Sequence, residues 1–88
     1  MTRYSRLPDI EAAPLQEETV LYLPALKKFC LLNRSAAFIW AELETPRTAR
    51  ELAARLQAVF SGADDAVAER DVSDTLRQLM DLGAVAAE

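Results

Sequence analysis

The spacing of hydrophobic positions changes abruptly at Asn33. An unbroken apolar run occupies residues 29–32, whereas beyond Asn33 the apolar positions recur every three or four residues, at Ala36, Ile39, Trp40 and Leu43. The first pattern is typical of a short strand and the second of a helix with one buried face. The Asn33 side chain can accept a hydrogen bond from a backbone amide one turn into this helix. The sequence therefore predicts a strand that leads directly into a capped helix.

Two more strands are predicted upstream. Residues 9–15 place apolar side chains between polar ones, and residues 19–23 (TVLYL) are rich in β-branched and aromatic side chains before Pro24. The links between the three strands are short, so an antiparallel sheet is expected, because parallel strands need a crossover of about a dozen residues. Residues 1–8 show no clear period and are expected to be a flexible lead-in to a single domain of residues 9–88.

The second helix has the clearest start in the chain. Thr48 and Glu51 have the spacing of a capping box, in which each side chain binds a backbone amide of the other residue. Ser61 and Gly62 are expected to end this helix, since glycine readily adopts the left-handed conformation found there. The expected buried face consists of Leu52, Leu56, Val59 and Phe60.

A third helix is predicted to begin between Asp64 and Glu69 and to end at Leu82 and Gly83. The acidic side chains of its first turns suit the positive end of the helix dipole. The predicted fold class is therefore α+β, with an N-terminal three-stranded antiparallel sheet followed by three helices. A winged helix-turn-helix has this arrangement.

The composition is that of an ordinary soluble domain. A chain of 88 residues can form one modest hydrophobic core. No apolar run approaches the roughly 20 residues that cross a bilayer, and the start lacks the apolar segment of a secretory signal. We therefore expect a cytoplasmic protein that does not contact a membrane.

An enzyme is not expected, because the side chains that most often carry out catalysis are missing. The chain has no histidine, and its single cysteine, Cys30, has no partner for a Cys–His pair or a zinc cluster. The two glycines, Gly62 and Gly83, fall at predicted helix ends and not in a phosphate-binding loop. We predict no catalytic residue, no metal site and no cofactor, and we interpret Cys30 as a small apolar residue.

The charge distribution argues against binding to DNA. Winged helix-turn-helix proteins often bind DNA, so a DNA-binding regulator is the alternative function for this chain. Affinity for nucleic acid depends largely on Lys and Arg contacts to phosphates. The predicted third helix carries only two basic residues, Arg70 and Arg77, against a larger acidic set, Glu69, Asp71, Asp74 and Asp81. We therefore expect no nucleic-acid partner.

Three segments carry a family resemblance when they are taken in order. They are LLNRSAAFIWAEL (31–43), PRTARELAARL (46–56) and ERDVSDTLRQLMDLGAV (69–85). Together they resemble the PqqD family of small peptide-binding proteins, also known as precursor recognition elements of ribosomally synthesised and modified peptides (RiPPs), over residues 18–85. The resemblance implies a non-catalytic winged helix-turn-helix domain. Such a domain binds the leader of a precursor peptide and presents it to a radical SAM enzyme or a leader protease.

The resemblance also implies a binding site. In the family, the leader lies as an extra antiparallel strand along the third strand, in a cleft against the third helix. The corresponding strand residues are Lys28, Phe29, Cys30, Leu31 and Leu32, and the corresponding helix residues are Asp71, Val72, Thr75, Leu76 and Leu79. Val72, Leu76 and Leu79 are more simply explained as core than as ligand contacts, and Asp71 is equally well explained as a solvated charge. Thr75 stands where the family often has a bulky apolar residue, which predicts an enlarged pocket.

The physical chemistry of residues 28–32 supports such a site independently. If this strand ends the sheet, one of its edges has unpaired amides and carbonyls, which proteins usually cover or protect with charge. Peptides bind such edges by β-augmentation, although a loop or a dimer partner could also cover the edge. The acidic third helix predicts Lys or Arg in the leader. Which face of the strand points into the cleft is left open by the sequence.

Phe38 lies on the helix face opposite Ile39 and Trp40, at a position where the family tends to have small residues. Two interpretations follow. Either the segment around Leu7 or Ile10 packs over Phe38, or Phe38 is a docking point for the partner enzyme. The protein is expected to be a monomer or a swapped dimer.

Overall fold

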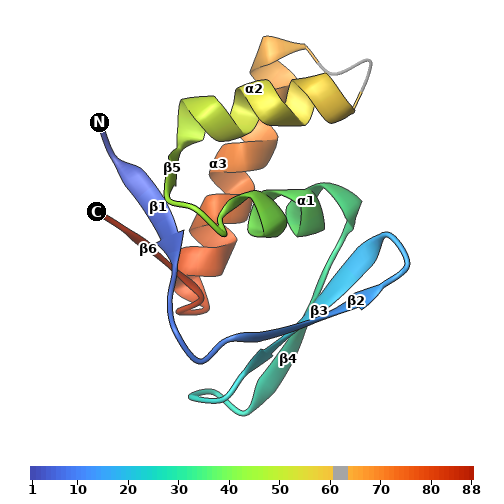
Figure 1. Ribbon diagram of the computed structural model, residues 1–88, viewed down its shortest axis with the longest axis vertical. Helices are drawn as coiled ribbons and strands as arrows, with labels where there is room; N and C mark the ends of the chain where they lie inside the picture. The colour runs from blue at the N-terminus through green and yellow to red at the C-terminus, as the bar shows by residue number, and fades with distance from the viewer. Residues whose placement is uncertain (61–63) are drawn as a thin grey trace.

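The computed structural model of the protein describes residues 1–60 and 64–88. Strands and helices alternate irregularly along the chain (Figure 1). In chain order they are β1 (Arg3–Arg6), β2 (Glu11–Leu15), β3 (Glu18–Leu23), β4 (Lys28–Leu32), α1 (Arg34–Glu42), β5 (Arg47–Thr48), α2 (Ala49–Val59), α3 (Asp65–Asp81) and β6 (Val85–Ala87).

The expected antiparallel sheet is formed by β2, β3 and β4, with β3 in the centre. The register pairs Leu21 with Cys30 and Val20 with Leu31. Three leucines of the sheet, Leu21, Leu23 and Leu32, are buried in the core beneath the helices. The sheet followed by three helices confirms the predicted α+β fold class.

A second small sheet was not expected from the sequence. In it, β1 lies between β5 and β6 and pairs antiparallel with both. The first eight residues are therefore not simply a loose lead-in, because Arg3–Arg6 is part of the fold. These strands are two to four residues long, and so short a segment carries no hydrophobic period. Their pairing is determined by the tertiary structure, which brings the two ends of the chain together (Figure 1).

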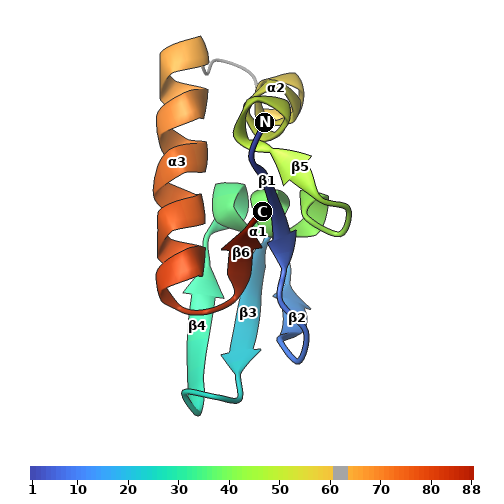
Figure 2. The same ribbon diagram turned by 90° about the vertical axis from the view of Figure 1, so that its left-hand side faces the viewer.

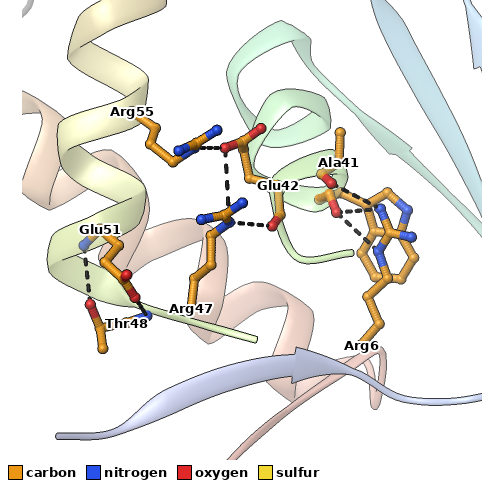
Figure 3. Close-up of polar contacts among 8 residues, drawn as sticks. Arg6, Ala41, Glu42, Arg47, Thr48, Glu51 and Arg55 are labelled. Carbon is orange, nitrogen blue, oxygen red and sulfur yellow. Dashed lines mark hydrogen bonds and ion pairs between the residues drawn. The ribbon is translucent and has the colours of Figure 1, made fainter. Parts of the chain in front are cut away.

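Arg6 connects this second sheet to α1. Its Nε and Nη2 atoms donate to the backbone carbonyl of Trp40 at 3.0 and 2.6 Å, and its guanidinium lies 4.6 Å from the centre of the Trp40 ring (Figure 3). The Trp40 carbonyl lies in the last turn of the helix and also accepts from the Leu43 amide at 3.2 Å, so Arg6 adds further donors to this carbonyl. Burial lowers the pKa of Arg6, while the nearby Glu44 carboxylate raises it.

The predicted helix starts are confirmed. The Asn33 side chain accepts a hydrogen bond from the Ala36 amide at 2.9 Å. Thr48 and Glu51 form the capping box, with hydrogen bonds of 2.8 and 3.1 Å (Figure 3). Asp64 caps α3 by accepting from the Val67 amide at 2.8 Å.

The buried helix faces agree with the predicted pattern except in the last turn of α2. The four residues predicted for α1, Ala36, Ile39, Trp40 and Leu43, are all buried. In α2, Leu52 and Leu56 are buried, but Val59 is 54% exposed and its assignment to the core was wrong. Half-buried Phe60, just beyond the helix end, continues the apolar face instead of Val59. The predicted end at Ser61 and Gly62 falls outside the described residues. In the ranges that the structure describes, no helix is long and apolar enough to cross a membrane.

Candidate functional site

β4 is an edge strand, and α3 lies beside it. Within the described part of the chain, β4 pairs with β3 on one side and has no strand on the other. Figure 2 shows this free side next to the last turns of α3. Backbone amides and carbonyls on the free side therefore have no strand partner, which is the condition for adding another strand.

A groove with a volume of about 490 Å³ runs between β4 and α3. Its sheet side and its helix side contribute almost equally to its lining. The sheet side consists of Leu23, Lys28, Phe29 and Cys30, and the helix side of Asp74, Arg77, Gln78, Asp81 and Leu82.

The groove combines apolar surface with charges of both signs. Leu23 is buried and Leu82 and Cys30 are half-buried, so the floor is apolar. The half-buried Cys30 thiol lies 3.9 Å from the amide nitrogen of Gln78, across the groove. An apolar floor is suited to binding apolar side chains of another chain, because removing apolar surface from water is favourable.

The charged side chains at the walls are balanced in number. Asp74 and Asp81 come from α3, and Arg77 and Lys28 stand with them around the same groove. The site is therefore not simply an acidic wall, as the sequence of the third helix suggested. It can pair with a basic and with an acidic side chain of a ligand at different points along its length.

None of the helix residues predicted for the site lines this groove, and their part in peptide binding stays a prediction. Val72, Thr75, Leu76 and Leu79 are buried, with exposed fractions of 0 to 8%, and Asp71 is not among the residues that line the groove. Thr75 is buried and is not among the residues that line this groove. The periodic apolar stripe packs into the core, and the neighbouring stripe of Asp74, Gln78 and Asp81 forms the wall. This second stripe is polar, so hydrophobic periodicity could not reveal it.

The strand residues predicted for the site divide between two faces. Cys30 and Leu32 point toward the helices, with Cys30 half-buried and Leu32 buried. Phe29 and Leu31 point to the opposite face and are 74% and 57% exposed. Both faces of the strand contribute to the groove, and Cys30 does so from the helix-facing side. Lys28 and Phe29 line the groove as well.

The outer face of the sheet contains a second hollow, of about 700 Å³, which the sequence analysis missed. The rings of Tyr22 and Phe29 lie side by side there, with centroids 4.9 Å apart. The other lining residues are Glu11, Ala12, Ala13 and Val20. The signal that could have revealed this face is the alternation of Val20 and Tyr22 with the buried leucines of β3.

Phe38 is half-buried against a residue that was not anticipated. Its ring meets the ring of Phe60 edge-on, with centroids 5.6 Å apart. This contact comes from the end of α2, and packing of the segment around Leu7 or Ile10 over Phe38 stays a prediction. A shallow hollow beside Phe38 also includes the exposed Val59.

A known family model matches most of the chain. The family is described as coenzyme PQQ synthesis protein D (PqqD), and the match covers residues 18–85. This range begins with β3 and ends with the first residue of β6, so it contains both sides of the groove. No curated protein gives a significant sequence match.

Two solved structures share the whole fold. TbiB1 in complex with the TbiA(beta) leader peptide is 25% identical, with a TM-score of 0.82, and the match covers 92% of this chain and 93% of that one. A lasso peptide synthetase B1 complexed with the leader peptide is 22% identical, with a TM-score of 0.77, and the match covers 94% and 96% of the two chains. At these levels of identity the second structure bears on the fold alone.

Proposed function

The chain belongs to the PqqD family, and we propose that it binds the leader of a ribosomally synthesised precursor peptide as an added antiparallel strand on β4. The protein is then a non-catalytic cytoplasmic carrier. It presents the bound peptide to a modifying enzyme, either a radical SAM enzyme or a leader protease.

The observation that supports this proposal best is the position of the free edge of β4 directly beside an apolar groove. In β-augmentation, backbone hydrogen bonds provide affinity and side-chain pockets provide specificity. The free edge of β4 can supply the backbone hydrogen bonds, and the apolar floor around Leu23, Cys30 and Leu82 can supply a side-chain pocket. The similar TbiB1 structure holds a leader peptide, which is consistent with the same use of this fold.

The other edge of the sheet is less suitable for adding a strand. β2 contains Pro14, which has no amide hydrogen and is a common means of protecting an edge. Pro14 pairs with Thr19, next to the turn-flanking pair of Leu15 and Glu18. Because hydrogen-bonded and non-bonded pairs alternate, the nitrogen of Pro14 is directed away from β3. The free edge of β2 thus lacks a donor where a strand would need one.

The charges around the groove define the chemistry of the expected ligand. A leader strand running along β4 would pass Asp74 and Asp81 on the helix side. We expect a Lys or Arg side chain of the leader in this position. The exposed pairs contribute modestly, about 0.2–1 kcal/mol each, so the charges select and orient the leader, and the backbone bonds and apolar contacts supply most of the affinity.

Cys30 provides a direct test, because it is the single cysteine of the chain and lines the groove. A synthetic peptide with the leader sequence of the nearest encoded short peptide is titrated into the protein while alkylation of Cys30 by iodoacetamide is followed by mass spectrometry. Saturating peptide should slow alkylation at least several-fold, and a scrambled peptide of the same composition should not. An unchanged alkylation rate, together with no affinity up to high micromolar peptide, would count against strand addition at β4.

Docking of the modifying enzyme at Phe38 is a separate and weaker part of the proposal. The half-buried ring packs on Phe60, so Phe38→Ala should cost stability as well. Loss of enzyme coupling with an unchanged melting temperature would support docking. A lower melting temperature with normal coupling at a permissive temperature would assign Phe38 to packing alone.

A further inference from the structure

Phe29 lies where two hollows meet. It lines the groove between β4 and α3 and also the hollow on the outer face of the sheet. Its ring contacts Tyr22, yet 74% of the residue is exposed. Leu31, two positions along the same face, is 57% exposed. The proposed leader site is therefore continuous with an uncovered apolar surface on the far side of the sheet.

The geometry of paired strands determines where the side chains of an added strand lie. Residues directly opposite each other in antiparallel strands place their side chains on the same face. A leader residue opposite Cys30 therefore enters the groove. The leader residues opposite Phe29 and Leu31 must lie on the outer face.

The backbone pattern leads to the same two residues. Leu15 and Glu18 flank a two-residue turn and so occupy a hydrogen-bonded position. Because such positions alternate along an antiparallel ladder, Leu21 bonds toward β4 and its partner is Cys30. The amides and carbonyls of the two neighbours of Cys30, Phe29 and Leu31, are then directed to the free edge.

We propose that the outer face around Tyr22, Phe29 and Leu31 is a second recognition surface for the same leader peptide. It takes apolar side chains, aromatic or branched aliphatic, at two leader positions separated by one residue. This inference rests on the proposed strand addition. The leader is the occupant that the geometry favours, because any strand bonded to Phe29 and Leu31 brings its own side chains onto their face. Side chains of the bound leader are thus recognised on both faces of the extended sheet.

The test uses a double variant, Phe29→Thr with Leu31→Thr, which introduces β-branched residues that favour a strand and removes most of the apolar surface. Affinity for the fluorescently labelled synthetic leader peptide is measured by anisotropy. We expect roughly ten-fold weaker binding, because each cross-strand apolar pair contributes a factor of about two to five. Leu15→Thr is the matched control. Leu15 is 54% exposed on the same face but lies on β2, away from the added strand, so its replacement should leave affinity unchanged.

A second measurement separates recognition from folding. The melting temperature of the double variant should stay within a few degrees of the parent, since both side chains are exposed. If loss of the Tyr22–Phe29 contact lowers it further, Leu31→Thr alone is used, with an expected two- to five-fold loss of affinity.

The outcomes distinguish this inference from the proposed function. If the parent protein binds the peptide and shields Cys30, but the double variant binds equally well, the outer face is not a recognition surface and strand addition stands. An equal loss of affinity in Leu15→Thr would also overturn the inference, because the effect would then not be confined to β4. If the parent neither binds nor shields Cys30, the proposed function fails and the inference fails with it.

Discussion

The thiol of Cys30 lies 3.9 Å from the side-chain amide nitrogen of Gln78, and this contact spans the groove between β4 and α3. The two residues are 48 positions apart in the sequence. Gln78 is exposed on α3, so it can be replaced with little effect on the core. It is therefore the best position at which to block the groove.

Gln78→Trp should fill the groove and weaken the affinity for the leader at least ten-fold. The expected change in stability is small, since exposed helix positions away from special features usually tolerate substitution within about 0.5 kcal/mol. Calorimetric titration with the leader peptide and thermal denaturation measure the two effects. Ser73→Trp, at another exposed position of α3, serves as the control. Full affinity in Gln78→Trp would show that the leader binds elsewhere.

Asp74 and Asp71 form a matched pair for testing electrostatic recognition. Asp74 lines the groove and Asp71 does not, although both lie on α3 and carry the same charge. Asp74→Lys should weaken leader binding about three- to ten-fold at low salt, and the difference should shrink at about 1 M salt because ions screen exposed charges. Asp71→Lys should change affinity much less. Equal effects of the two substitutions would indicate a long-range charge effect and no specific pairing.

Arg6 is expected to stabilise the whole fold, because it binds the Trp40 carbonyl and stacks on the Trp40 ring. Arg6→Ala should cost about 1–3 kcal/mol in the free energy of unfolding. For a domain of this size, each kcal/mol corresponds to a fall of about 4–8 °C in melting temperature. Arg6→Lys keeps the charge but loses the planar fork and should recover only part of the loss. Arg3→Ala, an exposed change in the same strand, should be nearly neutral.

Glu51 should make stability depend on pH. Its hydrogen bond to the backbone amide of Thr48 lowers the pKa of the Glu51 carboxyl in the folded state, although desolvation partly opposes this. A carboxyl with a lowered folded pKa contributes stability that is present above its unfolded pKa of about 4.3. That contribution is lost as the pH falls through the folded value. Glu51→Gln keeps a hydrogen-bonding side chain but cannot ionise.

The free-energy difference between the parent and Glu51→Gln should therefore be larger at pH 7 than at pH 3. Urea denaturation at both values measures it. A difference of the same size at both pH values would mean that the charge of Glu51 does not contribute to the cap.

Patterns within a few neighbouring residues were sufficient to predict much of this fold. The caps at Asn33 and Thr48 depend on contacts within four residues, so the sequence reveals them directly. The strands β1, β5 and β6 depend on partners that are distant in the sequence and carry no hydrophobic period of their own, and for that reason they were missed.

The strand side of the groove agrees with the residues predicted from the sequence, whereas the helix side is lined by neighbours of the predicted residues. The edge of β4 follows from the apolar run at residues 29–32 and the order of the strands. An unbroken apolar run does not indicate which side chains are buried, so the exposure of Phe29 and Leu31 required the structure. On α3, the helical spacing of the apolar residues predicted the buried stripe that contains Val72 and Leu76. The groove lies on the adjacent polar stripe, whose residues resemble an ordinary solvated surface.

The pairing of β1 with β6 also has a practical consequence for protein engineering. The amide of Glu88 donates to the carbonyl of Arg3 at 2.8 Å, so the two ends of the described chain leave the domain side by side (Figure 1). Domains with adjacent ends tolerate insertion into other proteins. This domain could be built into a surface loop of a chosen enzyme as a single cassette. Neither junction would lie within β4 or α3, so the proposed leader site would be left intact in the host.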